Sequence, residues 1–146
     1  AYPIAKYQAL VPDYLKALEK EMEYVSQWVH KNSYTIGSVY IGGGTPTAID
    51  EKALAMLIDA LQSSFDIAGK EFTIEAGRPD TISREKLEVM YSRHVSRISI
   101  NPQTMNQKTL RLIGRNHTPE DIENKFQLAR LVGFDNINMD LSPSFL

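Results

Sequence analysis

Polar residues that could bind a small ligand follow each of several short apolar runs in the chain. Residues 42–44 are three consecutive glycines, and glycine loses the most conformational entropy on folding. A glycine triplet therefore indicates a place where something approaches the main chain closely. The later runs end in carboxylates or an amide. The residues of this pattern are Gly42, Gly43, Gly44, Thr45, Glu75, Gln103 and Asp140.

The same residues restrict the chemistry of the ligand. The glycines do not form GxGxxG, and no Gly-Lys-Ser/Thr follows them, so both phosphate-binding fingerprints are missing. Glu75 and Asp140 would repel a polyphosphate but suit hydroxyl groups or a positive charge, and Arg115 could bind a carboxylate. A nucleoside joined to an amino acid fits this set better than ATP does.

Each residue also has a plainer interpretation. An aspartate at a strand end is usually a turn residue, and three glycines can form only a tight turn. Glu75 could simply pair with Arg78. Their occurrence at consecutive strand ends favours a shared site, because buried carboxylates are costly unless something pairs with them.

Four helices and about four strands are predicted to position these residues. Apolar residues recur at helical spacing within residues 12–30, 51–65, 84–91 and 119–132. Asp50, Ser83 and Thr118 are suited to cap the last three helices at their N-termini, and Gly133 is placed to end the fourth. Apolar and β-branched runs predict strands at 38–41, 71–75, 95–100 and 136–140.

This alternation predicts an α/β fold with parallel strands and right-handed crossovers. A doubly wound open sheet and part of a (β/α) barrel both satisfy the order. In either architecture the carboxyl ends of the strands face one crevice, where ligands bind.

Composition narrows the class of protein. The chain has 146 residues and a net charge of -2, and it shows no basic excess that would favour nucleic acid. No apolar run approaches the roughly 18 residues of a membrane span. The sequence contains no cysteine, and its three histidines lack metal-ligand spacing, so neither a disulfide nor a metal site is expected.

Five segments resemble one family in order. YIGGGTPT at residues 40–47 is similar to the YxGGGTPT signature of radical S-adenosylmethionine enzymes related to oxygen-independent coproporphyrinogen III oxidase. EAGRPD at 75–80, RISINPQTM at 97–105, IGR at 113–115 and NINMD at 136–140 resemble its coproporphyrinogen dehydrogenase, or HemZ-like, subgroup.

The resemblance implies a partial radical SAM (β/α) barrel over residues 1–141, cytoplasmic haem biosynthesis and a tetrapyrrole substrate. It implies that the glycines and Thr45 contact the methionine part of S-adenosylmethionine, and that Arg115 takes its carboxylate. It further implies that Gln103 and Asp140 bind the ribose and that Glu75 lies near the amino or sulfonium charge.

Two departures from the family limit what is expected of this chain. The family holds a [4Fe-4S] cluster with a CxxxCxxC loop, which is missing here, so the chain alone is expected to be inactive. Residues 142–146 do not follow the family pattern and are interpreted as a tail. The uncovered edges of a partial barrel predict self-association.

Two other functions stay open from sequence. The haem chaperone branch shares the glycine motif, although residues 75–80 favour the oxidase subgroup. An unrelated α/β nucleotide-binding domain would also fit the pattern of helices and strands.

Overall fold

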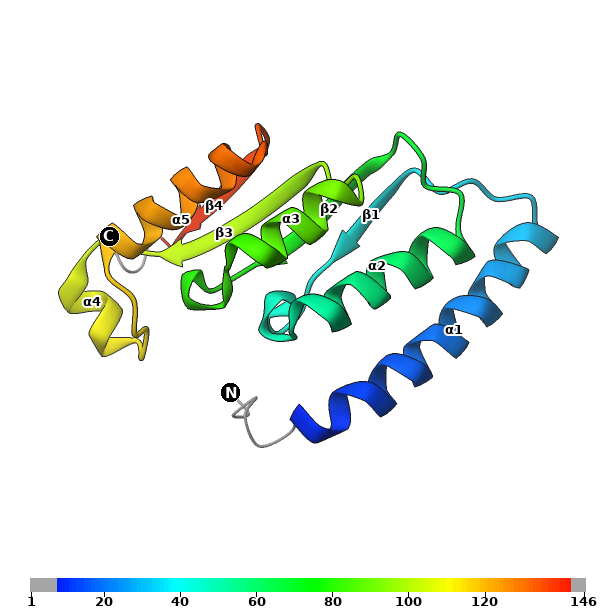
Figure 1. Cartoon of the computed structure of the whole chain (residues 1–146), viewed down its shortest axis with the longest axis horizontal. Helices are drawn as coiled ribbons and strands as arrows, with labels where there is room; N and C mark the ends of the chain where they lie inside the picture. Colours follow the sequence, from blue (N-terminus) through cyan, green and yellow to red (C-terminus); the bar gives the residue numbers. More distant parts are fainter. Residues whose placement is uncertain (1–7, 143–146) are drawn as a thin grey trace.

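The computed structural model describes residues 8–142. Its helices and strands alternate along the chain (Figure 1). In chain order they are η2 (Gln8–Leu10), α1 (Val11–Lys31), β1 (Ser38–Ile41), η3 (Pro46–Ala48), α2 (Glu51–Ser64), β2 (Glu71–Ala76), η4 (Pro79–Thr81), α3 (Arg84–Ser92), β3 (Arg97–Gln103), α4 (Gln107–Leu112), α5 (Pro119–Val132) and β4 (Ile137–Leu141).

The four strands form one parallel sheet in the order β1-β2-β3-β4. Sequence neighbours are therefore neighbours in the sheet, each joined to the next through at least one helix, as parallel pairing requires. The predicted α/β fold with four parallel strands is confirmed.

One face of the sheet is apolar and carries the core. The register aligns Ile41, Ile74, Ile98 and Ile137 across the four strands, so their side chains share a face. Helices α2, α3 and α5 lie over this face (Figure 1). Their buried side chains include Leu54, Ile58, Leu87, Met90 and Ala129.

Helix α1 lies outside this layer and packs against α2 (Figure 1). Leu15 and Met22 are buried against Leu57 of α2. Val25, an apolar residue within the helix predicted over residues 12–30, is 38% exposed. The buried residues of α1 thus lie in its N-terminal part, where it packs against the shorter α2.

The capping predictions are confirmed by hydrogen bonds. Asp50 accepts the amide of Ala53, Ser83 accepts that of Lys86, and Thr118 forms a capping box with Asp121.

One predicted strand begins at a different residue, and one helix was not predicted. The third strand begins at Arg97 rather than at Val95, because the Val95 amide donates to the Met90 carbonyl at the end of α3. Helix α4 was not predicted; its cap is Asn106, whose side chain accepts from the amides of Lys108 and Thr109.

Candidate functional site

The face of the sheet opposite the helices is polar. Side chains alternate between faces along a strand, and the register aligns Glu75 with Ser99 and Ser99 with Asn138. Thr73 and Ser99, on the central strands, are 1% and 3% exposed, whereas Tyr40 on β1 is exposed. We call this surface the polar face; its residues are Tyr40, Thr73, Glu75, Ser99, Asn101, Asn138 and Asp140.

A continuous series of hydrogen bonds crosses this face from the glycine loop after β1 to β4. The Gly43 amide donates to Glu75 Oε2 (3.1 Å), and Asn101 Nδ2 donates to Glu75 Oε1 (3.2 Å). Ser99 Oγ donates to Asn101 Oδ1 (2.7 Å). Asn138 Nδ2 donates both to Ser99 Oγ (3.3 Å) and to Asp140 Oδ1 (2.7 Å). This polar network brings the glycine loop, Glu75 and Asp140 into one connected arrangement.

The electrostatics of Tyr40 agree with this arrangement. Partial burial raises the pKa of the Tyr40 hydroxyl, and the carboxylates of Glu75 and Asp140 raise it further. Glu75 pairs with the Gly43 amide and Asn101, not with Arg78 as the plainer interpretation of the sequence proposed.

The three glycines are required for two different reasons. A β-carbon on Gly42 would overlap the ring of Tyr40, so a side chain there would require this exposed ring to move. Gly43 and Gly44 have φ of 83° and 58°, a left-handed conformation that strongly favours glycine. Among residues 8–142 no atom lies within 4 Å of a β-carbon built on either of them, so within the described part of the chain their outward side is open.

Gln103 ends β3 in an uncommon conformation. Its φ is 70°, which is rare for a residue with a β-carbon and often marks a functional site. A register irregularity precedes it in the pairing with β4, and its carbonyl accepts the amide of Ser142 (2.9 Å). Gln103 therefore sits at the same end of the sheet as the polar network.

Arg115 reaches this end of the sheet from the turn after α4. Its Nη1 donates to the carbonyls of Gly77 (2.9 Å) and Asn101 (3.3 Å), beside the ends of β2 and β3. Burial lowers the pKa of Arg115, and the neighbouring charge of Arg78 lowers it further. These two hydrogen bonds fix a positive charge next to the polar network.

A hollow of about 650 Å³ adjoins the glycine loop. Gly42, Gly43 and Thr45 line one side of it, and apolar residues of α1 and α2 line the other. This volume lies within the range of small-ligand pockets, roughly 300–1,000 Å³.

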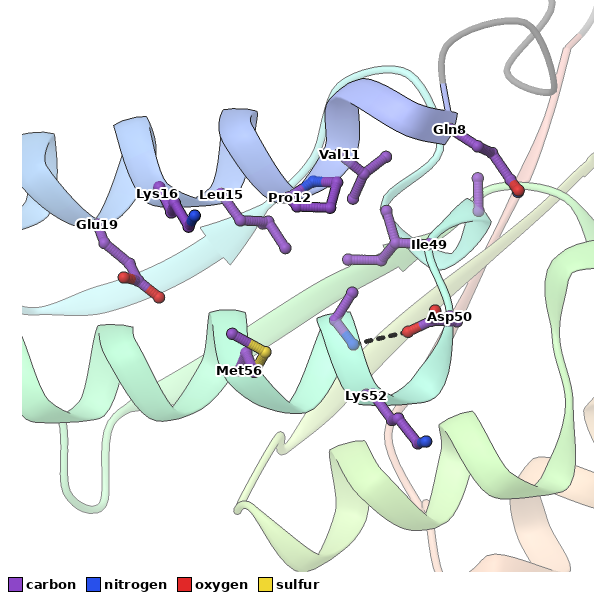
Figure 2. Close-up of a pocket in the computed structure, with 12 residues that line it drawn as sticks. Gln8, Val11, Pro12, Leu15, Lys16, Glu19, Ile49, Asp50, Lys52 and Met56 are labelled. Atoms are coloured by element: carbon purple, nitrogen blue, oxygen red, sulfur yellow. Dashed lines mark hydrogen bonds between the residues drawn. The ribbon is translucent and has the colours of Figure 1, made fainter.

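A second hollow, of about 440 Å³, lies between α1 and α2 (Figure 2). Its centre is apolar, with Val11, Leu15 and Ile49 pointing inward, and Lys16 and Glu19 lie on α1 beside it. The Asp50 carboxylate accepts a hydrogen bond from the Ala53 amide at the start of α2 (Figure 2). This hollow has no polar network comparable to that of the strand ends.

Sequence reasoning found the strand ends, including the Asn101-Pro102-Gln103 run that closes the third strand, but missed Thr73, Ser99 and Asn138 of the polar face. Ser99, Asn101 and Asn138 hold the network together, and Thr73 Oγ1 is buried without a hydrogen-bond partner within residues 8–142. The alternation of polar and apolar residues along β3 and β4 could have indicated them. Ser99, for example, is a polar residue between Ile98 and Ile100.

Two kinds of site are not found. Within residues 8–142 no group of three or more histidine, aspartate or glutamate side chains could hold a metal ion, and the sequence has no cysteine. Among those same residues no helix is both long and apolar enough to span a bilayer.

Known proteins resemble this chain closely. The family described as the Radical SAM superfamily matches residues 5–144. The chain is 42% identical over 143 residues to the oxygen-independent coproporphyrinogen-III oxidase-like protein HemZ of Bacillus subtilis, covering 97% of this chain and 28% of that protein. It is 38% identical over 135 residues to the heme chaperone HemW of the same species, covering 90% and 34%.

The fold agrees with these similarities. The structure of coproporphyrinogen III oxidase (HemN) from Escherichia coli superimposes with a TM-score of 0.77 at 29% identity, covering 92% of this chain and 30% of that one. The chain thus spans about a third of the length of the relatives it matches.

Proposed function

The chain belongs to the radical SAM superfamily, and we propose that the carboxyl ends of its strands form part of a binding site for S-adenosylmethionine. The observation that carries this proposal is the polar network from Gly43 to Asp140, which joins the glycine loop after β1 to β2, β3 and β4 at one end of the sheet. In this superfamily the bound cofactor supplies hydrogen-abstraction chemistry when a cluster reduces it.

The residues present fit this cofactor. Gly42, Gly43, Gly44 and Thr45 offer main-chain and hydroxyl groups to its methionine part, beside open space at the second and third glycine. The fixed guanidinium of Arg115 is the partner for the methionyl carboxylate.

The remaining assignments follow from charge. Gln103 and Asp140 are proposed to bind the ribose hydroxyls, since amide and carboxylate oxygens accept hydrogen bonds from hydroxyl groups. Glu75 is proposed to lie near the amino or sulfonium charge, because its carboxylate is already oriented by the Gly43 amide.

A [4Fe-4S] cluster does not fit this chain. Such clusters are held by cysteine thiolates, and the sequence contains none. We therefore expect the chain alone to produce no 5′-deoxyadenosine after treatment with iron, sulfide and a reductant. Product above the protein-free background would contradict this expectation.

The wider activity is proposed to be that of the coproporphyrinogen oxidases. In the family, propionate side chains of coproporphyrinogen III undergo oxidative decarboxylation to vinyl groups without oxygen, in the cytoplasm. The EAGRPD segment at residues 75–80 supports this branch.

The second candidate is the haem chaperone branch, which the similarity to HemW favours. A titration with haem, followed by the Soret absorbance, separates the two. The oxidase proposal expects no saturable shift at one haem per chain, and a stoichiometric shift would favour the chaperone branch.

A titration with S-adenosylmethionine tests the site itself. Gly43→Val places a branched side chain at a φ of 83° where the cofactor is proposed to lie, so measurable affinity should be lost. Gly37→Val is the matched control, because Gly37 has no positive φ and, among the described residues, no atom lies within 4 Å of its β-carbon position. Equal affinities of the two variants would contradict the proposed site.

β1 and β4 each pair with one strand, which is the basis for the expected self-association. Sedimentation that depends on protein concentration is the expected result, and a monodisperse monomer would contradict it.

A further inference from the structure

The loops that follow β1 and β2 are tied together by their threonines. Thr47 belongs to η3, at the end of the GGGTPT segment, and its side chain is fully buried. Its Oγ1 lies 2.7 Å from Oγ1 of Thr81 in η4. Because the Thr81 hydroxyl already donates to the Arg78 carbonyl (2.7 Å), the Thr47 hydroxyl is the donor between them.

Lys86 completes this connection from the first turn of α3. Its Nζ donates to the carbonyl of Thr47 (2.7 Å) and to that of Thr81 (3.2 Å). A positive charge in the first turn of a helix opposes the helix dipole, and burial lowers the pKa of this lysine. Two carbonyl acceptors on separate loops compensate for this placement. We call Lys86, Thr47 and Thr81 the loop clamp.

The glycine loop is thus held at both ends. The amide of Gly43 is bound to Glu75, and Thr47 is bound by the loop clamp. Gly43 and the next residue, Gly44, have left-handed φ values, which an unrestrained glycine segment would not keep.

We propose that Lys86 is a positioning residue that holds the glycine loop in the conformation in which its main chain meets the ligand. Thr47 then serves the clamp rather than the ligand, which divides the GGGTPT segment into a ligand-facing part and an anchoring part. The effect of Lys86 on S-adenosylmethionine affinity rests on the proposed function. Its effect on the conformation of the glycine loop does not.

A purely structural lysine provides the matched control. Lys125 on α5 donates from Nζ to the carbonyl of Ile82 (2.6 Å), next to η4, and the bond does not reach the glycine loop. Lys86→Met and Lys125→Met therefore each remove lysine-to-carbonyl hydrogen bonds near η4. Only Lys86→Met removes a hydrogen bond to Thr47, which then keeps its contact with the Thr81 hydroxyl alone.

The experiment measures amide hydrogen exchange and S-adenosylmethionine binding in the full chain. In Lys86→Met, exchange over residues 42–47 should rise about tenfold, and affinity should fall by a similar factor. Lys125→Met should leave both unchanged. Thr81→Val, which removes the hydroxyl with little change of shape, should reproduce the faster exchange of residues 42–47.

Three outcomes would overturn the inference. These are unchanged exchange over residues 42–47 in Lys86→Met, the same increase in Lys125→Met, or an increase spread evenly over the whole chain. If the wild-type chain binds no S-adenosylmethionine, the proposed function fails, and the exchange data still decide whether the clamp exists.

Discussion

The two faces of the sheet are built from neighbouring residues but are held together by different forces. Ile98 points into the helix-covered face and is fully buried among aliphatic side chains. Ser99, the next residue, points to the polar face and is 3% exposed, yet its partners are Asn101 and Asn138. One face gains stability from apolar packing, and the other is held by hydrogen bonds between polar side chains.

This difference separates what the fold needs from what the site needs. The apolar face is stabilised by burial, which depends on area and tolerates similar shapes. The polar network depends on matched donors and acceptors, because an unpaired buried polar group is costly. Substitutions on the two faces should therefore differ in size and in kind.

The largest effect is expected on the apolar face. Ile98→Ala should lower the free energy of unfolding by about 3 kcal/mol, since the side chain is fully buried and a cavity remains. Urea denaturation measures this change. A loss below about 1 kcal/mol, the range of surface substitutions, would show that the helices do not pack on this face as described.

A smaller loss in the free energy of unfolding is expected at the next residue, Ser99. Ser99→Ala should cost about 1–2 kcal/mol, because Asn101 loses a buried hydrogen bond and Asn138 loses a partly buried one. The same denaturation series includes this variant. If Ser99→Ala were as costly as Ile98→Ala, the distinction between the two faces would be wrong.

A third prediction concerns the conformation of Gln103. At its φ of 70°, Gln103→Gly should be more stable than Gln103→Ala by roughly 1 kcal/mol, because only glycine avoids the left-handed strain. At Ser99 the order should reverse, since a strand interior disfavours glycine. Thermal unfolding of the four variants gives both comparisons, and the same order at both positions would contradict the strain.

The smallest effect is a pH dependence. Burial lowers the pKa of His117, which is 3% exposed, and the charge of Arg115 lowers it further. The unfolded chain therefore binds a proton more readily than the folded chain. The stability due to neutral His117 is complete above about pH 6.5 and is lost as pH falls through the folded-state pKa.

His117→Gln should accordingly flatten the loss of stability between about pH 7 and pH 5, measured against wild type in the same buffers. Parallel curves for the two proteins would show that His117 is not held neutral by burial.

Much of the fold could be predicted from local signals. The caps at Asp50, Ser83 and Thr118 work within one helical turn, and the strands were apolar runs between such helices. The start of β3 could not be predicted, because the amide of Val95 is taken by the end of α3. That competition depends on geometry, not on β-propensity.

The candidate site was predicted only at its edges. Glu75 and Asp140 were recognised as strand ends, but the network that connects them passes through Ser99, Asn101 and Asn138. These interior positions depend on the register between strands, which sequence alone did not give. The close approach of the Tyr40 ring to Gly42 was also missed, because it depends on the conformation of that side chain.

The most direct test of the account is a titration of the ¹⁵N-labelled chain with S-adenosylmethionine, followed by amide chemical shifts. We expect saturable shifts that concentrate at Gly43, Gly44, Glu75, Asn101 and Asp140. Amides around the hollow between α1 and α2, such as those of Lys16 and Met56, should stay unchanged (Figure 2). Shifts confined to that hollow, or no saturable shifts at the strand ends, would contradict the central claim that the polar face binds this cofactor.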